Sequence, residues 1–443
     1  MEYLLSFLIL VLNLVNYEIP LGTALFTAIG SFLFVLLFFA VHKKTRNFPV
    51  SCIIMMCYVW QISWVNIFGG PTEELQLPWF YVIGALMVVY AVFNVKKLFE
   101  KNYSVKRLLV FSCSVILFNL PLFLSRTSYV NGLKEYVIIG FFIAVSLIAF
   151  LFSDSATAEN YEHFKRAVIW AVLLTSLALV FQYVMTVYGG ITLFKFEAAL
   201  SFSGEYQTSC YLLMEDHSSA TVMIGCGAFY IIERISKKTW FYTVPMFAVV
   251  VVSMALTSRR TSTVSLLIAL ALYVFFHYKG FGKKTVYIFL CTAVGILLIY
   301  YLTLTRPVDD LSQLLDDNGR FATYKKAIEL LLKNPFGVGY DNEYIARFTG
   351  IIPHNTLLRW LCMGGYLFGA QMSLLFGMIL FTAGKKKLTP EYWSLIYSVI
   401  ASLFIPDILC ARFFVIFCAA AFLMKSERER DVPCAVPEAP QKI

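Results

Sequence analysis

The sequence predicts an all-α, polytopic membrane protein, and three observations lead to that class. Hydrophobic residues occupy 59% of the 443 positions and charged residues only 14%, whereas about 25% of a soluble domain is charged. The mean hydropathy is +0.74. Apolar runs of about 20 residues, the length that crosses a bilayer core, recur along the chain.

The apolar runs predict about 12–14 transmembrane helices, arranged as one transmembrane domain over residues 1–424. The first run is expected to be an uncleaved span, because no small-residue cleavage site follows it. The charged, Pro-rich segment 425–443 is expected to be a disordered cytoplasmic tail. In chain order the runs cover 3–17, 21–41, 49–69, 78–95, 107–125, 135–153, 166–187, 217–234, 239–257, 260–278, 284–303, 353–382, 392–408 and 410–424.

The orientation follows from the lysines and arginines of the short loops, which concentrate on the cytoplasmic side of membrane proteins. One set of alternate loops is rich in them, so both termini are predicted to be cytoplasmic and the long 304–352 loop extracytoplasmic. The formal charge of +9 reflects this bias and does not indicate nucleic acid. The poorer set of loops holds only Arg126, Lys134, Lys195, Arg259, Arg260 and Arg412.

Two predicted outer loops, 188–216 and 304–352, are longer than turns require. The second contains an amphipathic helix over 320–333, ended by Asn334-Pro335. We expect this helix to lie in the membrane interface, with its basic face toward water or anionic headgroups; an ordinary docked surface helix is the alternative. The expected apolar face is Phe321, Tyr324, Ile328 and Leu331, opposite Lys325, Lys326, Glu329 and Lys333.

The polar residues at the predicted outer surface suggest chemistry on a charged substrate. His354 and Asn355 open a span, after a Phe336–Gly339 turn with two glycines, and His217 opens another. A lone interfacial histidine is usually structural. Here, however, arginines lie at the same level, and an imidazole with an ordinary pKa of ~6.5 suits a general base.

The outer arginines are candidates for phosphate binding, because a guanidinium fork pairs with phosphate in two parallel hydrogen bonds. Arg259 and Arg260 break the charge bias at the start of a span, and Arg320 lies on the same side. Headgroup contact would be the ordinary explanation for the pair. Arg359 lies in the first turns of the span that His354 opens, where snorkelling to the interface is the ordinary explanation.

Several of these segments, in this order, resemble the C-terminal signature of the O-antigen ligase/polymerase family over about residues 250–380. The Arg260 doublet and the Thr323-Tyr324 pair, where the family often has Trp, depart from the pattern. The segments are Thr257-Ser258-Arg259, Gly319-Arg320, Asn334-Pro335-Phe336-Gly337-Val338-Gly339, His354-Asn355-Thr356-Leu357-Leu358 and Gly364-Gly365.

The resemblance implies a GT-C-like glycosyltransferase in the bacterial inner (cytoplasmic) membrane that takes glycan from undecaprenyl pyrophosphate at the outer face. It implies His354 as the base and Arg259 and Arg320 as pyrophosphate ligands; because Arg260 doubles the first arginine, either of that pair could be the ligand. Asn355, Arg359, Asp216 and His217 are further substrate-binding candidates; the last two occupy a segment where polymerases of this family often have an acidic, serine-containing motif. The scheme requires no metal and no cofactor.

We therefore expect a metal-independent, inverting polymerase of lipid-linked O-antigen, capsular or exopolysaccharide repeat units. The same machinery could serve a ligase that transfers glycan to lipid A core or another acceptor. A lipid-linked oligosaccharide flippase or transporter is the alternative of another class. Expected partners are the lipid-linked donor and acceptor, membrane lipids, a chain-length regulator and a flippase. The sequence leaves the sugar, the linkage, the acceptor, the oligomeric state and the role of the N-terminal 200 residues open.

Overall fold

The computed structural model describes most of the chain, and the statements below concern that part. It describes residues 1–63, 65–69, 77–96, 118–124, 129–153, 156–194, 197–200, 206–210, 212–214, 217–236, 238–257, 260–277, 280, 285, 295, 319–385, 389–406 and 408–424.

The described chain is helical except for one short antiparallel hairpin, β1 (Glu197–Leu200) with β2 (Tyr206–Ser209). This confirms the all-α, polytopic class. The predicted runs at 107–125 and 284–303 lie mostly or wholly outside the described residues. The helices are α1 (Glu2–Glu18), α2 (Thr23–Thr45), α3 (Phe48–Tyr58), η1 (Trp60–Ile62), α4 (Trp79–Phe93), α7 (Tyr129–Leu151), α8 (Ala158–Val187), α9 (His217–Glu233), α10 (Trp240–Leu256), α11 (Arg260–His277), α14 (Arg320–Lys333), α15 (Asn342–Thr349), α16 (Thr356–Lys385), α17 (Pro390–Ser402), η2 (Ile408–Cys410) and α18 (Arg412–Leu423).

Four of the described helices are long and apolar enough to cross a bilayer by themselves, namely those at Thr23–Thr45, Gly132–Leu151, Ala158–Val187 and Thr356–Gly384. The structure also has shorter apolar helices, among them α3, α9 and α18. Helices α3 and α18 are buried along nearly their whole length, as expected for helices that are apolar on every side. Outer helices such as α2 and α10 expose large apolar side chains, including Phe32, Phe39 and Phe241.

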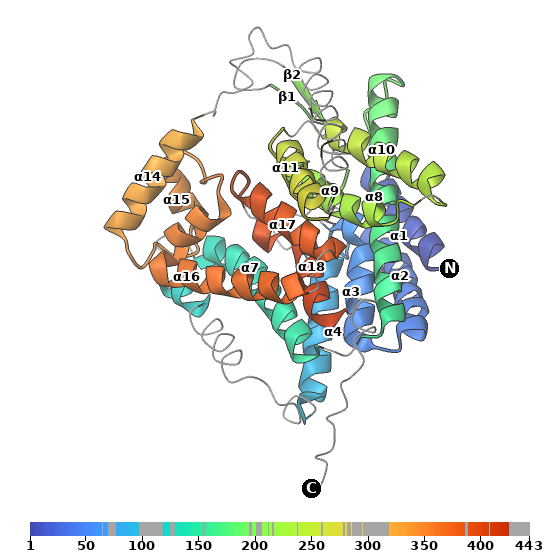
Figure 1. Ribbon diagram of the computed structural model, residues 1–443, viewed down its shortest axis with the longest axis horizontal. Helices are drawn as coiled ribbons and strands as arrows, with labels where there is room; N and C mark the ends of the chain where they lie inside the picture. Colours follow the sequence, from blue (N-terminus) through green and yellow to red (C-terminus); the bar gives the residue numbers. More distant parts are fainter. Residues whose placement is uncertain are drawn as a thin grey trace.

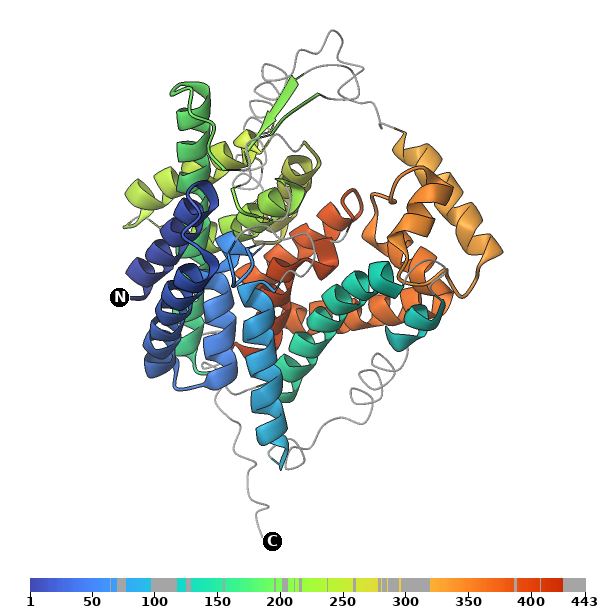
Figure 2. The same ribbon diagram turned by 180° about the vertical axis from the view of Figure 1, so that it is seen from behind.

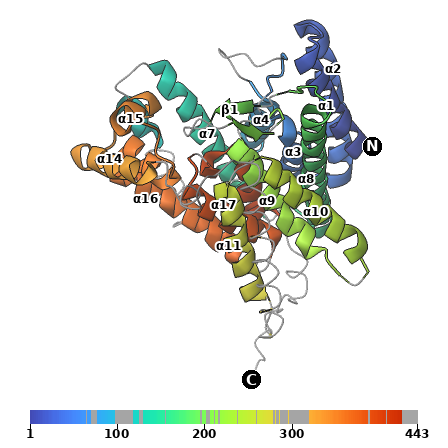
Figure 3. The same ribbon diagram turned by 90° about the horizontal axis from the view of Figure 1, so that it is seen from above.

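The helices form a bundle with a separate group at one side (Figures 1 and 2). Helices α17 and α18 run through the middle, and α9 packs beside α17, as the view from above also shows (Figure 3). On one side α1, α2, α3, α8 and α10 pack together. On the other side α14 and α15 lie over α16 and the start of α7.

Several elements differ from the sequence prediction. The third span ends as an α-helix at Tyr58 and continues as η1, where the Trp60 indole donates to the Thr175 hydroxyl at 3.2 Å. Helix α17 stops at Ser402, six residues before the predicted end. The hairpin and α15 were not predicted, because their strands of four residues and helix of eight residues are short and contain no long apolar run.

Helix α16 is broken at Gly365, which has φ +69° and ψ −165°. The loop after α14 runs along this break and makes strand-like hydrogen bonds with it. Val338 N donates to Cys362 O at 2.9 Å, Gly339 N donates to Met363 O at 2.8 Å, and Tyr366 N donates to Pro335 O at 3.0 Å. The backbone groups released by the break are thereby satisfied, which a helix in a bilayer requires.

The glycines of this junction allow two backbones to touch. A Cβ on Gly337 would lie 2.3 Å from Met363 O, and one on Gly365 would lie 2.0 Å from Pro335 O. Both residues also have φ values in the left-handed region that favours glycine. The Phe336–Gly339 turn therefore serves first to join α14 to α16.

Helix α14 has the predicted bounds, and the side that packs inside the protein is largely not the expected apolar face. Its buried residues are Thr323, Ala327, Leu330 and Leu331, whereas Phe321 and Ile328 are exposed. Small side chains at Thr323 and Ala327 let α14 approach α16 closely, as between membrane helices.

We predict that Gly365→Ala destabilises the protein, because the new Cβ overlaps Pro335 O and the backbone conformation is strained for alanine. The expected loss is at least about 2 kcal/mol, measured as a lower melting temperature of the detergent-purified protein. Gly377→Ala is the matched control in the same helix, since no atom lies within 4 Å of its added Cβ. Equal melting temperatures for the two variants would contradict the junction described here.

Candidate functional site

The start of α16 holds His354 and Asn355. The Asn355 Oδ1 atom accepts from Leu358 N at 2.9 Å and so caps the helix. Its Nδ2 donates to Leu403 O at 3.3 Å, and the Thr356 hydroxyl donates to Ile405 O at 3.1 Å. His354 is half-buried, and the two residues that follow it are hydrogen-bonded to the segment after α17.

Tyr324 of α14 fixes the backbone at His354. Its hydroxyl donates to His354 O at 2.7 Å and lies 3.4 Å from Leu403 O. Partial burial raises the pKa of Tyr324, while the charge of Arg320 opposes the shift. The phenol therefore stays protonated, and remains a donor, through the neutral pH range.

Arg320 is the first residue of α14, one turn before Tyr324, and is half-buried. Among the described residues it makes no hydrogen bond or ion pair. A guanidinium in that position can bind an anionic ligand. It lies on the same helix as Tyr324, whose hydroxyl binds the backbone at His354.

The segment before α11 packs against the start of α9. The hydroxyls of Thr221 and Thr257 are 2.5 Å apart, and Cys210 N donates to Leu256 O at 3.2 Å. Thr257 directly precedes the Ser258-Arg259-Arg260 run, and Thr221 lies one turn after His217. Two of the segments singled out in the sequence therefore meet at one end of the bundle.

Helix α17 connects this pair of segments to the His354 segment. The Tyr397 hydroxyl donates to Ser262 O in α11 at 3.1 Å. To reach it, the ring passes across α9 at Gly225, where an added Cβ would lie 2.6 Å from the ring. At its end α17 leads into Leu403, whose carbonyl accepts from Asn355. We call the bundle end where these contacts occur the His354 end.

The structure describes only part of the predicted site. Arg259 and Asp216 lie outside the described residues. Arg260 begins α11 and His217 begins α9, but only their backbones are described. The contacts above bring Thr257 and the start of α9 to the same end of the bundle as Arg320, His354 and Asn355.

Arg359 is engaged inside the protein and is only 1% exposed. Its Nη2 lies 2.9 Å from the Glu135 carboxylate of α7, and its Nε donates to Asn342 Oδ1 at 2.9 Å. These contacts join α16 to α7 and α15, which is a structural role. Direct binding of substrate by Arg359 stays a prediction.

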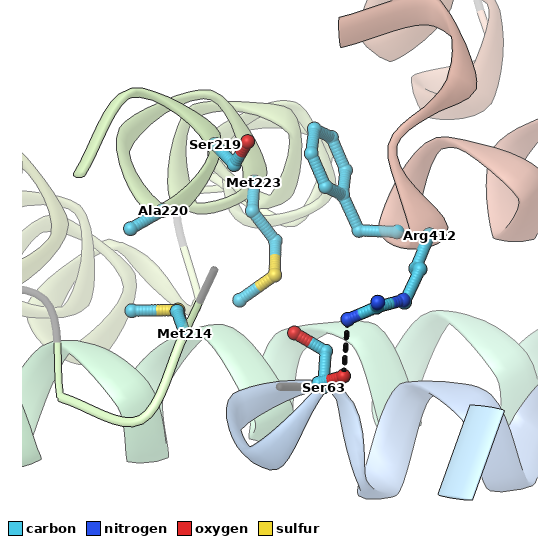
Figure 4. A pocket seen from close by; sticks show the side chains of 7 residues that line it. Ser63, Met214, Ser219, Ala220, Met223 and Arg412 are labelled. Atoms are coloured by element: carbon cyan, nitrogen blue, oxygen red, sulfur yellow. Dashed lines mark hydrogen bonds between the residues drawn. The ribbon is translucent and has the colours of Figure 1, made fainter. Parts of the chain in front are cut away.

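Sequence reasoning missed several residues that shape this end. Tyr397 has no motif that would single it out, and the sequence placed Tyr324 on the apolar face of its helix without predicting its contact with His354. Arg412 begins α18 and lines a small pocket with Ser63, Ser219 and Met223, together with Met214, Ala220 and Phe413 (Figure 4). One signal for Arg412 was present in the sequence, namely that it is among the few arginines of the predicted outer loops.

We predict that Glu135→Leu lowers stability by about 3–5 kcal/mol, because it leaves the buried Arg359 charge without its carboxylate. Adding Arg359→Met should recover most of the melting temperature. Glu343→Leu is the control, since its ion pair with Arg347 is exposed and contributes little. A melting temperature for Glu135→Leu equal to that of the control would contradict a structural role for the buried pair.

Comparison with known protein families gives one match. Residues 245–370 match the model of the O-antigen ligase family; no curated protein matches the chain. The matched segment begins in α10 and ends in α16, beyond the Gly365 break. It includes the Thr257 segment, α14, the Phe336–Gly339 turn and His354, as the sequence resemblance predicted. Residues 245–370 are therefore similar to the O-antigen ligase domain, the family that the sequence segments resemble.

Proposed function

We propose that the protein polymerises oligosaccharide repeat units carried on undecaprenyl pyrophosphate, at the outer face of the bacterial cytoplasmic membrane. His354 acts as the general base, and Arg259, Arg260 and Arg320 hold the pyrophosphate of the donor. The observation that carries the proposal is the Tyr324 hydrogen bond to His354 O, because it ties the proposed base to the helix that begins at Arg320.

In the proposed reaction, a hydroxyl of the acceptor unit attacks the anomeric carbon of the donor glycan. The new glycosidic C–O bond forms as the bond to the pyrophosphate oxygen breaks, and His354 takes the hydroxyl proton. The arginines stabilise the charge that develops on the leaving pyrophosphate. Direct displacement inverts the anomeric configuration. The imidazole must be neutral to accept this proton.

The buried charges favour an enzyme over a flippase. Among the described residues they lie near helix ends, as with Glu135, Arg359, Glu391 and Arg412. A carrier of charged lipid-linked sugars needs polar groups along its path through the membrane. A ligase remains the second candidate, because a different acceptor could use the same base and pyrophosphate ligands.

We predict that His354→Gln lowers the rate of glycan transfer by about 10²–10⁴-fold, because the variant lacks the base that takes the acceptor proton. Transfer would be measured with purified enzyme and lipid-linked repeat units, by the length of the product chains. His277→Gln is the control, since this histidine stacks on Tyr273 at the opposite end of α11. Normal chain lengths from a correctly folded His354→Gln variant would end the base assignment.

We predict that Arg320→Gln lowers kcat/KM for the donor by roughly 10²-fold, because one cation at the leaving pyrophosphate is lost. The neighbouring helix offers a matched control in Arg347→Gln, whose side chain is exposed and paired with Glu343. The two variants would be compared in the same transfer assay. If both behave like the wild type, Arg320 is not a pyrophosphate ligand.

A further inference from the structure

Helix α14 has three faces of different character. One packs inside the protein, as described above. A second is apolar but exposed, since Phe321, Ile328 and Leu332 are 74%, 49% and 66% exposed. Successive residues are about 100° apart around a helix, so these positions, at i, i+7 and i+11, fall on one side. We call this row of three residues the apolar stripe.

The third face of α14 is basic. Lys325, Lys326 and Lys333 are all exposed. Within the described part of the chain, none of the three forms an ion pair, although Glu329 lies one turn from Lys325. Lys333 lies over the Phe348 ring of α15, 5.3 Å from its centre, which leaves its charge uncompensated. The positive charge of this face is therefore open to an anion outside the chain.

The contacts of α14 place it beside the point where α16 enters the bilayer. Helix α16 is apolar and long enough to cross a membrane from Thr356 onward. The Tyr324 hydroxyl donates to His354 O, just before that span, and Cys362 Sγ donates to Ala327 O at 3.6 Å. A helix at this level lies in the interface, where apolar side chains reach acyl chains and lysines reach headgroups.

We propose that α14 binds anionic phospholipids of the surrounding leaflet, and that this contact supports the geometry at His354. The apolar stripe inserts among the acyl chains, and the three lysines bind headgroup phosphates. Clustered lysines select anionic over zwitterionic lipid, because only the former carries net negative charge. The lipid contact rests on the geometry of α14 alone, whereas its effect on glycan transfer rests on the proposed function.

Anchoring α14 in the lipid would steady two groups of the proposed site together. Arg320 and Tyr324 lie one turn apart on this helix, and Tyr324 holds the backbone at His354. A bilayer without anionic headgroups loses the electrostatic part of the attraction and binds the helix less firmly. We therefore expect the rate of transfer to depend on the charge of the lipid.

Insertion of the stripe is tested with a polarity-sensitive fluorophore. Ile328→Cys and Glu329→Cys, about 100° apart around the helix, would each be labelled in nanodiscs, with labelled wild type as the blank. The label at 328 should emit at shorter wavelength and be quenched by nitroxides on the acyl chains, unlike the label at 329. The blue shift should be larger with phosphatidylglycerol than with phosphatidylcholine alone. Equal spectra and quenching at the two positions would overturn the proposal, whatever reaction the enzyme catalyses.

The role of lipid charge is tested by glycan transfer in two kinds of nanodisc. We expect the wild type to be about threefold or more faster with roughly one third phosphatidylglycerol than with phosphatidylcholine alone. The triple variant Lys325→Gln/Lys326→Gln/Lys333→Gln should transfer at equal rates in the two bilayers and lose the extra blue shift at 328. Replacing the same three lysines by arginine keeps the charge and should preserve both effects. All three side chains are exposed, so the substitutions are compatible with folding.

The matched control removes three exposed lysines from the predicted cytoplasmic side, Lys43, Lys96 and Lys238. Anionic lipid also changes the local concentration of a charged donor, but it does so equally for every variant. The control triple glutamine variant should therefore keep the acceleration seen with the wild type. Its loss in the control would attribute the effect to overall protein charge and overturn the proposal.

The remaining outcomes separate the proposal from the proposed function. Equal acceleration by phosphatidylglycerol in the wild type and the α14 glutamine variant would overturn the dependence on lipid charge, while leaving the transfer reaction intact. A requirement for the α14 lysines only with acidic glycans, in either bilayer, would assign the basic face to the glycan and overturn lipid binding. Absence of transfer by the wild type in both bilayers would remove the proposed function, and the label at 328 would still decide whether α14 binds anionic lipid.

Discussion

The break in α16 and its repair by the loop after α14 determine the geometry of the site. A helix interrupted within a membrane domain releases carbonyls that lipid cannot satisfy. Here the amides of Val338 and Gly339 donate hydrogen bonds to the carbonyls of Cys362 and Met363. Because the loop is held along the break, α14 must lie across the start of α16. That position brings the Tyr324 hydroxyl to the carbonyl of His354.

Buried polar contacts then fix the remaining elements around this junction. The ion pair of Arg359 with Glu135 ties α16 to α7. Tyr340 adds a second tie, since its hydroxyl donates to Phe118 O at 2.6 Å. Removing the Glu135 or Tyr340 side chain leaves a charge or a carbonyl acceptor without its partner in low dielectric, so substitutions at these positions are expected to destabilise the protein. The group formed by α14, α15 and the start of α16 is therefore a rigid support for His354.

The sequence alone predicted the class of fold, the bounds of α14 and the segments of the site, because hydropathy and helix-ending residues are local signals. It did not identify the packed side of α14, because burial and apolarity are not equivalent where lipid is the solvent: Phe321 and Ile328 are exposed, and Thr323 and Ala327 are buried. It could not pair Arg359 with Glu135, which lies far away in the chain. Such partners follow from packing, which local patterns do not encode.

Helix α14 also offers a route by which donor binding prepares the base. Arg320 and Tyr324 are one turn apart on a single rigid helix, so a ligand that draws Arg320 toward it moves Tyr324 as well. The Tyr324 hydroxyl holds both His354 O and the carbonyl of Leu403, and Leu403 starts the segment that leads to Arg412. Under the proposed function, donor binding at Arg320 would thus bias the backbone at His354, so that the base and the donor site respond to one another.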